Sequence, residues 1–135
     1  MRGIWRLAVV SALAVAAFVL ALASFEAVPA TECQMDAAGD ASYSVRFVTP
    51  PRSDATTQSM RITRGDVPVA GAQVCLRAAV EGMSGMSVSD VAVETSPGVY
   101  DVPVRFERSG SWDGTVIVTG DGAKAVGIPV SIEVG

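Results

Sequence analysis

The segment Gly82–Val118 decides the fold, and it reads GMSGMSVSDVAVETSPGVYDVPVRFERSGSWDGTVIV. Apolar and polar residues alternate along Tyr100–Phe106, which is the period-2 pattern of a half-buried strand. The pairs Pro97-Gly98 and Ser109-Gly110 are typical of turns, and they separate this run from its neighbours. The segment therefore predicts short strands joined by tight turns.

The same alternation recurs along the rest of the chain, and no segment after residue 30 has helical periodicity. About seven short strands at this spacing predict an all-β, Ig-like antiparallel β-sandwich. Because Pro103 and Pro129 cannot donate a hydrogen bond to a neighbouring strand, we expect them at sheet edges or bulges. The expected strands are Tyr43–Phe47, Met60–Thr63, Val74–Val80, Val91–Glu94, Tyr100–Phe106, Trp112–Val118 and Val126–Val134.

The N-terminus has the layout of an export signal. Arg2 and Arg6 precede the uncharged, apolar run Leu7–Ala23. Small residues suited to cleavage precede Ser24 and Thr31, so a cleaved signal peptide and a retained membrane anchor both stay open. Either outcome places the remainder outside the cytoplasm, secreted or anchored to the cell membrane.

Three parts are therefore expected. Residues 1–30 form a hydrophobic helix that serves as signal peptide or anchor, residues 31–50 an N-terminal segment with the first strand, and residues 51–135 the sandwich. From Ser24 onward the chain carries eight basic and fourteen acidic residues, a net charge of −6. Nucleic acid requires clustered lysine and arginine, so we expect no nucleic-acid partner.

Cys33 and Cys75 are the two cysteines of the chain. In an exported protein such a pair is most simply a disulfide, which would close a loop of about 43 residues and stabilise the fold by roughly 4 kcal/mol. The alternation puts Cys75 on the outer face of its strand, within reach of the N-terminal segment. Two other interpretations stay open: a lipidated Cys33, which the preceding Glu32 disfavours, and two free thiols.

The composition narrows the chemistry, because the chain contains no histidine and no asparagine. Without histidine there are no Ser–His or Cys–His nucleophile pairs, no common zinc site and no imidazole site for copper(II). Lys124, the one lysine, has no evident partner for a serine–lysine dyad. Carboxylates such as Asp101 and Glu107 are typical of a solvated outer face. We therefore expect a protein that is not an enzyme.

Met83 and Met86 form the one constellation that could hold a ligand. They are three residues apart, and the glycines beside them let the backbone turn so that both thioethers face one point. Thioether sulfur suits copper(I) in an oxidising compartment, although a third ligand such as Met60 or Met35 would be required. In the alternative interpretation the methionines fill the end of the sandwich or form an apolar contact surface.

Four short motifs, taken together in their order, resemble the YtkA-like/FixH family over about Pro51 to Val134. The resemblance implies an Ig-like domain that is exported or held in the membrane by one N-terminal segment. The motifs are Pro68-Val69-Ala70-Gly71-Ala72-Gln73-Val74, Gly82-Met83-Ser84-Gly85-Met86, Pro97-Gly98-Val99-Tyr100 and Ser109-Gly110-Ser111-Trp112.

The resemblance also implies an accessory role, because FixH-type proteins are linked to copper supply and to the assembly of respiratory oxidases. We therefore expect an interaction or assembly module with a protein partner in a membrane complex, and copper(I) carriage by Met83 and Met86 as the alternative. Copper-handling relatives of this architecture, such as CopC-like domains, use histidines beside methionines. This chain has no histidine, so copper(II) is not expected.

Overall fold

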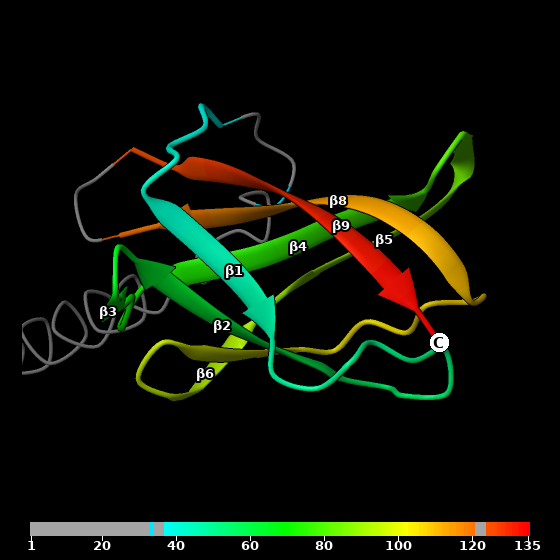
Figure 1. Cartoon of the computed structure of the whole chain (residues 1–135), viewed down its shortest axis with the longest axis horizontal. Helices are drawn as coiled ribbons and strands as arrows, with labels where there is room; N and C mark the ends of the chain where they lie inside the picture. The colour runs from blue at the N-terminus through cyan, green and yellow to red at the C-terminus, as the bar shows by residue number, and fades with distance from the viewer. Residues whose placement is uncertain (1–32, 34–36, 121–123) are drawn as a thin grey trace, which may run out of the picture.

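The computed structural model describes residues 33, 37–120 and 124–135. The expected signal peptide or anchor at residues 1–30 lies outside these residues, and so does Met35. Among the described residues, no helix is long and apolar enough to cross a membrane. The strands (Figure 1) are β1 (Tyr43–Phe47), β2 (Gln58–Arg64), β3 (Val67–Pro68), β4 (Gln73–Val80), β5 (Met83–Val91), β6 (Val93–Ser96), β7 (Val99–Val102), β8 (Gly110–Thr119) and β9 (Val126–Val134).

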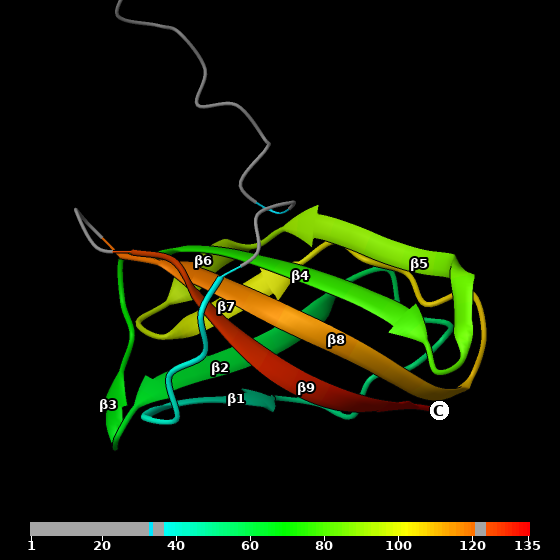
Figure 2. The same ribbon diagram turned by 90° about the horizontal axis from the view of Figure 1, so that it is seen from above.

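The strands form two antiparallel sheets that pack face to face (Figure 2). One sheet has the order β1-β2-β7-β6, with the short β3 paired to the end of β2, and the other has the order β5-β4-β8-β9. This arrangement confirms the predicted all-β, Ig-like antiparallel sandwich. The described residues form nine strands where about seven were expected, because β3 and β5 were not predicted.

The backbone turn expected around Met83 and Met86 is confined to Glu81 and Gly82, because Met83 begins strand β5. The alternation that marks a strand is broken here by an irregularity in the ladder. Ala79 pairs with Ser87, whereas the next residue of β4, Val80, pairs with Met83. Residues 84–86 of β5 therefore have no partner between the two successive pairs of this ladder, and they form a large bulge.

Two further strand predictions need correction at their ends. Val91 and Val93 were expected on one strand, but they belong to β5 and β6, which lie in different sheets. The strand predicted over Tyr100–Phe106 ends at Val102, directly before Pro103, which cannot donate to the ladder. The expectation for Pro129 is confirmed, because it lies on the edge strand β9.

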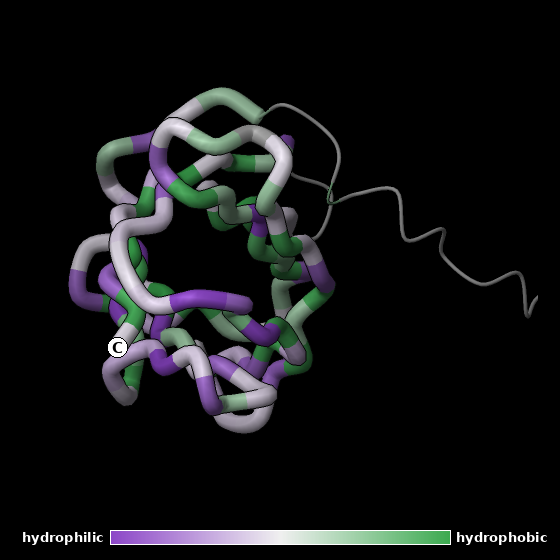
Figure 3. Tube along the Cα trace, turned by 90° about the vertical axis from the view of Figure 1, so that its right-hand side faces the viewer, coloured by the Kyte–Doolittle hydropathy of each residue, from purple (hydrophilic) through white to green (hydrophobic). Residues whose placement is uncertain are grey.

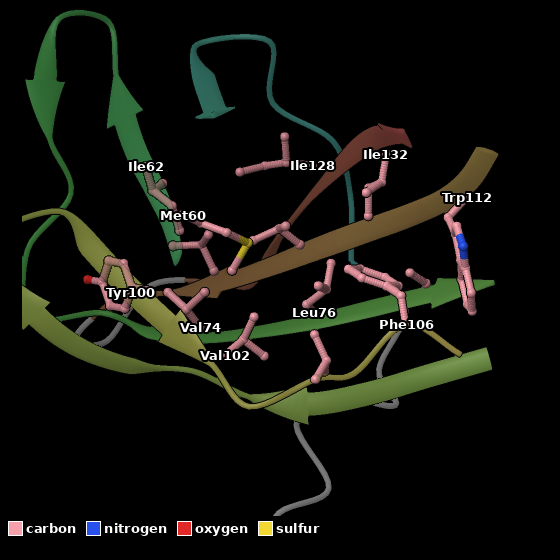
Figure 4. Close-up of a cluster of buried hydrophobic side chains, with 14 of the residues drawn as sticks. Met60, Ile62, Val74, Leu76, Tyr100, Val102, Phe106, Trp112, Ile128 and Ile132 are labelled. Carbon is pink, nitrogen blue, oxygen red and sulfur yellow. The ribbon is translucent and has the colours of Figure 1, made fainter. Parts of the chain in front are cut away.

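The inward-facing side chains of both sheets form a single main core (Figure 4). Tyr100 and Trp112 lie near its opposite ends, and Met60 and Leu76 lie between them. Seen along the long axis, hydrophobic and hydrophilic residues alternate along the chain, as expected for strands with one buried face (Figure 3). Fully burying one large apolar side chain contributes about 1.5–3 kcal/mol, so this core is the main source of stability.

Candidate functional site

The motif residue Tyr100 fastens the loop that precedes β4. Its side chain is 1% exposed, and its hydroxyl donates a hydrogen bond to the Val69 carbonyl oxygen at 2.8 Å. The same hydroxyl accepts a hydrogen bond from the Ala72 N–H at 3.2 Å. Burial raises the pKa of Tyr100, which keeps the phenol protonated as the donor. Tyr100 therefore supports the backbone and presents no free hydroxyl to a ligand.

Glu94, on strand β6, supports the same loop from the sheet edge. Its carboxylate accepts the Gly71 N–H at 3.2 and 3.0 Å, and it accepts the Gly98 N–H at 3.4 Å. The hydrogen bond from the Gly71 N–H, followed by the influence of the nearby Tyr100 hydroxyl, lowers the pKa of Glu94 below its usual value. The carboxylate thus joins the β3–β4 loop to the β6–β7 turn.

Gly98 lies in this turn with a φ of 78°, a conformation that favours glycine. A Cβ added there would lie 2.7 Å from the Pro68 Cβ and 3.2 Å from the Ile62 carbonyl oxygen. Two family motifs that are far apart in the sequence therefore meet here. We call the residues Pro68–Ala72, Glu94, Gly98 and Tyr100 the Tyr100 cluster. Its polar groups bind one another, so its role in the structure is to hold the loop and the turn together.

The tryptophan motif lies at the other end of the core. Trp112 packs edge-to-face against Phe106, with ring centroids 5.0 Å apart, and its Nε1–H donates to the Arg108 carbonyl oxygen at 3.1 Å. This hydrogen bond holds the backbone at Arg108. The Arg108 guanidinium in turn lies against Met83, with Nη1 at 3.8 Å from Sδ. The tryptophan therefore positions an arginine beside one of the two candidate metal ligands.

The two candidate methionines have different surroundings. Met83 is 47% exposed, whereas Met86 is half-buried and packs against the main core. Met60, suggested as a third ligand, has no exposed surface and lies inside the core (Figure 4). A metal ion bound to the exposed thioether of Met83 cannot reach the fully buried thioether of Met60. Met60 therefore does not supply the third ligand. The exposed Met83 instead has a cation, Arg108, as its polar neighbour.

The predicted disulfide between Cys33 and Cys75 is present, with a Cα–Cα distance of 5.5 Å. Both cysteines are buried with Ile117 in a second, smaller cluster on the outer face of the four-stranded sheet. Ala37 and Ala125 pack against it, and we call these five residues the disulfide cluster. The expectation that Cys75 faces outward and fastens the N-terminal segment is therefore confirmed. A disulfide of this kind is typical of an oxidising environment.

The remaining candidates stay apart from one another. Asp101 lies on β7, opposite Ser59 and Val93, and Glu107 and Lys124 are exposed outside the strands. Within the described ranges, no group of three or more Cys, Asp or Glu side chains is placed to hold a metal ion.

Sequence reasoning missed Glu94. Its signal was a lone carboxylate four residues before Gly98 of the Pro97-Gly98 turn, whose N–H it accepts.

These features define a small Ig-like β-sandwich whose sequence motifs build its scaffold. The chain belongs to the YtkA-like family, because the sequence model of that family matches residues 37–117. The matched region contains the β3–β4 loop, the β6–β7 turn and the tryptophan motif, so the resemblance to YtkA-like proteins is confirmed. Comparisons with curated proteins and with solved structures find no match.

Proposed function

We propose that this protein is a non-enzymatic, extracytoplasmic accessory domain that binds a protein partner along edge strand β5. The observation that carries the proposal is the unprotected edge of β5. This strand has nine residues, MSGMSVSDV, and pairs with β4 on one side only. It contains no lysine, arginine or proline, the residues by which proteins usually keep an edge strand from pairing with another chain.

The other edge strands carry such devices. Strand β9 contains Pro129, and its Gly127 N–H donates to the Ala38 carbonyl oxygen at 3.0 Å. Strand β1 has five residues and carries Arg46, and β6 has four residues and carries Glu94. Strand β5 itself has the bulge near its start and Asp90 near its end, whose carboxylate accepts the Val91 N–H at 2.8 Å. An extended partner segment can therefore add to the sheet along the rest of β5.

Exposed valines adjoin this edge. Val91, the last residue of β5, is 40% exposed, and Val93, the first residue of β6, is 65% exposed. Exposed apolar side chains beside open backbone groups are what a partner strand would cover. Among the described residues the motif side chains Tyr100 and Trp112 are buried, so a surface that binds a partner must lie elsewhere. The disulfide supports an extracytoplasmic location.

The test is co-purification of the full chain from native membranes solubilised in detergent, with partners quantified by mass spectrometry. We expect Val91→Lys/Val93→Lys to lose the specific partner, because it places one charge at the end of β5 and a second at the adjoining start of β6, and charges at an edge oppose strand pairing. The matched control is Val48→Lys/Val67→Lys, which adds the same charge away from β5. Val48 directly follows β1 and is 48% exposed, and Val67 lies on β3 and is 67% exposed. Thermal unfolding of both variants checks that they fold.

The outcome that rejects the proposal is equal partner recovery for the edge variant and the control. A wild-type chain that repeatedly purifies alone also rejects it. The nature of a recovered partner tests the further expectation of a membrane complex, because the proposal predicts an integral membrane protein or a subunit bound to one.

Copper(I) binding by Met83 and Met86 is the second candidate. Its supporting observation is the exposed thioether of Met83, since soft sulfur without a charge suits copper(I). Titration of the full chain with copper(I) against a competing chelator tests it. If these methionines bind the ion, Met83→Leu/Met86→Leu weakens binding, and Arg108→Ser strengthens it by removing a neighbouring positive charge. Unchanged affinity in both variants excludes the site.

A further inference from the structure

The outer face of the five-stranded sheet carries two arginines directly opposite each other. The ladder between β1 and β2 pairs Arg46 with Arg61 and pairs Ser44 with Thr63. The intervening residues, Val45 on β1 and Ile62 on β2, pack in the core, so the four polar residues lie on the opposite, outward face. Directly opposed side chains have Cβ atoms roughly 5 Å apart, and successive residues on one face of a strand are roughly 7 Å apart.

The pair has no direct counter-charge among the described residues, although Asp101 on β7 lies one diagonal step from Arg61 on the same face of the sheet. Neither arginine forms an ion pair or a side-chain hydrogen bond with a described residue, and the same is true of the hydroxyls of Ser44 and Thr63. Like charges directly opposite each other on neighbouring strands destabilise a sheet. The pair stands out further because the chain is acidic, with a net charge of −4. The direct opposition of two arginines is therefore unfavourable for the sheet by itself.

The four side chains line one surface groove with a volume of about 380 Å³. Gly65 and Asp66 complete its lining. Since these two residues follow Thr63 in sequence, they lie toward the hydroxyl end and away from Arg46 and Arg61. The groove therefore has two guanidinium groups at one end, two hydroxyl donors in the middle and a single carboxylate at the other end.

We propose that this groove binds a phosphate group, free or as part of a lipid headgroup, with Arg46 and Arg61 as the main ligands. A guanidinium offers parallel N–H donors that match two oxygens of one phosphate, and charge-assisted hydrogen bonds of this kind are the strong ones. Ser44 and Thr63 add hydroxyl donors. The position of Asp66 limits the site to one anionic group at the arginine end. The groove lies on the sheet that does not contain β5, so this proposal does not depend on partner binding.

Titration of the full chain in a neutral detergent, followed by amide NMR at constant ionic strength, tests the site. The probes are inorganic phosphate, glycerol 3-phosphate and glycerophosphoglycerol, with chloride as the reference salt. We expect saturable shifts at residues 44–46 and 61–63, and binding at least about tenfold weaker in Arg46→Ser/Arg61→Ser. Preference for glycerophosphoglycerol, a diester, indicates a lipid headgroup, and preference for the other two probes indicates a free phosphate or monoester.

The matched control is Arg105→Ser/Lys124→Ser, which removes the same charge at two exposed residues outside the groove. The control is expected to bind as the wild type does. Arg46→Lys/Arg61→Lys keeps the charge without the paired donors, and we expect intermediate affinity. The proposal is overturned if no probe gives saturable shifts in the groove, if the serine variant binds like the wild type, or if the control loses binding equally.

Discussion

The disulfide cluster and the Tyr100 cluster both fasten irregular segments near the beginning of strand β4, by different means. On the outer face of the sheet, Cys75 holds the N-terminal segment through a covalent bond and a few small apolar contacts. Directly before β4, Tyr100 and Glu94 hold the β3–β4 loop through hydrogen bonds to its backbone. The first attachment needs two residues and an oxidising environment. The second needs several residues in exact positions, and all of them except Glu94 belong to the family motifs.

The difference predicts two kinds of sensitivity. A disulfide acts mainly by restricting the unfolded chain, so its contribution disappears on reduction and depends little on local geometry. The Tyr100 cluster acts in the folded state, so it is insensitive to reductant and responds to single substitutions and to pH. The four predictions below test this contrast, in order of decreasing effect.

Removing the crosslink has the largest expected effect. Cys33→Ala/Cys75→Ala is expected to lower the free energy of unfolding by about 4 kcal/mol, because the unfolded chain regains the entropy of an open loop. Urea unfolding of the oxidised wild type and of the variant measures this. Reduced wild type should match the variant. If reduction leaves the unfolding midpoint unchanged, the crosslink does not stabilise the protein and the contrast with the Tyr100 cluster fails.

In the Tyr100 cluster, Gly98→Ala is expected to lower the free energy of unfolding by about 3 kcal/mol. The alanine must adopt the left-handed backbone conformation of Gly98, and its Cβ also collides with Pro68. Gly82→Ala is the control, since Gly82 has a similar φ of 75° and nothing within 4 Å of the added atom. The control should cost about 1–2 kcal/mol. Equal costs in the two variants would mean that the contact between Gly98 and Pro68 is unimportant.

Loss of the Tyr100 hydroxyl leaves the Val69 carbonyl and the Ala72 N–H without a partner. We expect Tyr100→Phe to lower the free energy of unfolding by about 2 kcal/mol, in oxidised and in reduced protein alike. Tyr43→Phe is the matched control, because no side-chain hydrogen bond of Tyr43 to a described residue is present and its ring would still lie under Arg64. A cost for Tyr100→Phe no larger than that of the control would contradict the proposed role of the hydroxyl.

The smallest effect is expected from Glu94, and it depends on pH. Its hydrogen bonds hold the pKa below the usual value, so the carboxylate stabilises the fold above about pH 4.5, and this contribution is lost as the pH falls through the lowered pKa. Unfolding of Glu94→Gln between about pH 6 and pH 3 should therefore show a shallower loss of stability than the wild type. Glu81→Gln, at an exposed turn residue, should follow the wild-type profile.

The fold could be predicted wherever one face of a strand is buried. Strand β9 alternates Val126, Ile128, Val130 and Ile132 with polar or small residues, and it lies where this pattern placed it. Strand β5 could not be predicted in this way. Only Met86 and Val88 of this strand pack against the core, and a bulge breaks the period before them, so the alternation in Met86–Ser89 is too short to predict a strand.

The candidate site shows the same division. The pairing of the two cysteines follows from composition, and it was predicted correctly. That Met86 packs against the core while Met83 lies beside Arg108 depends on contacts between β5 and the segment before β8, about 25 residues later. Spacing alone made these two methionines a pair, and the folded chain gives them different neighbours.

By itself, the sequence determined the sandwich architecture, the disulfide and the family, because each depends on local alternation, composition or short motifs. Only the tertiary structure decided what those motifs do and which surfaces are left open. Tyr100 and Gly98 meet the loop before β4 only after two strands have paired, and Arg46 meets Arg61 only in the register between β1 and β2. Contacts of this kind depend on which strands become neighbours, and no short stretch of sequence specifies that.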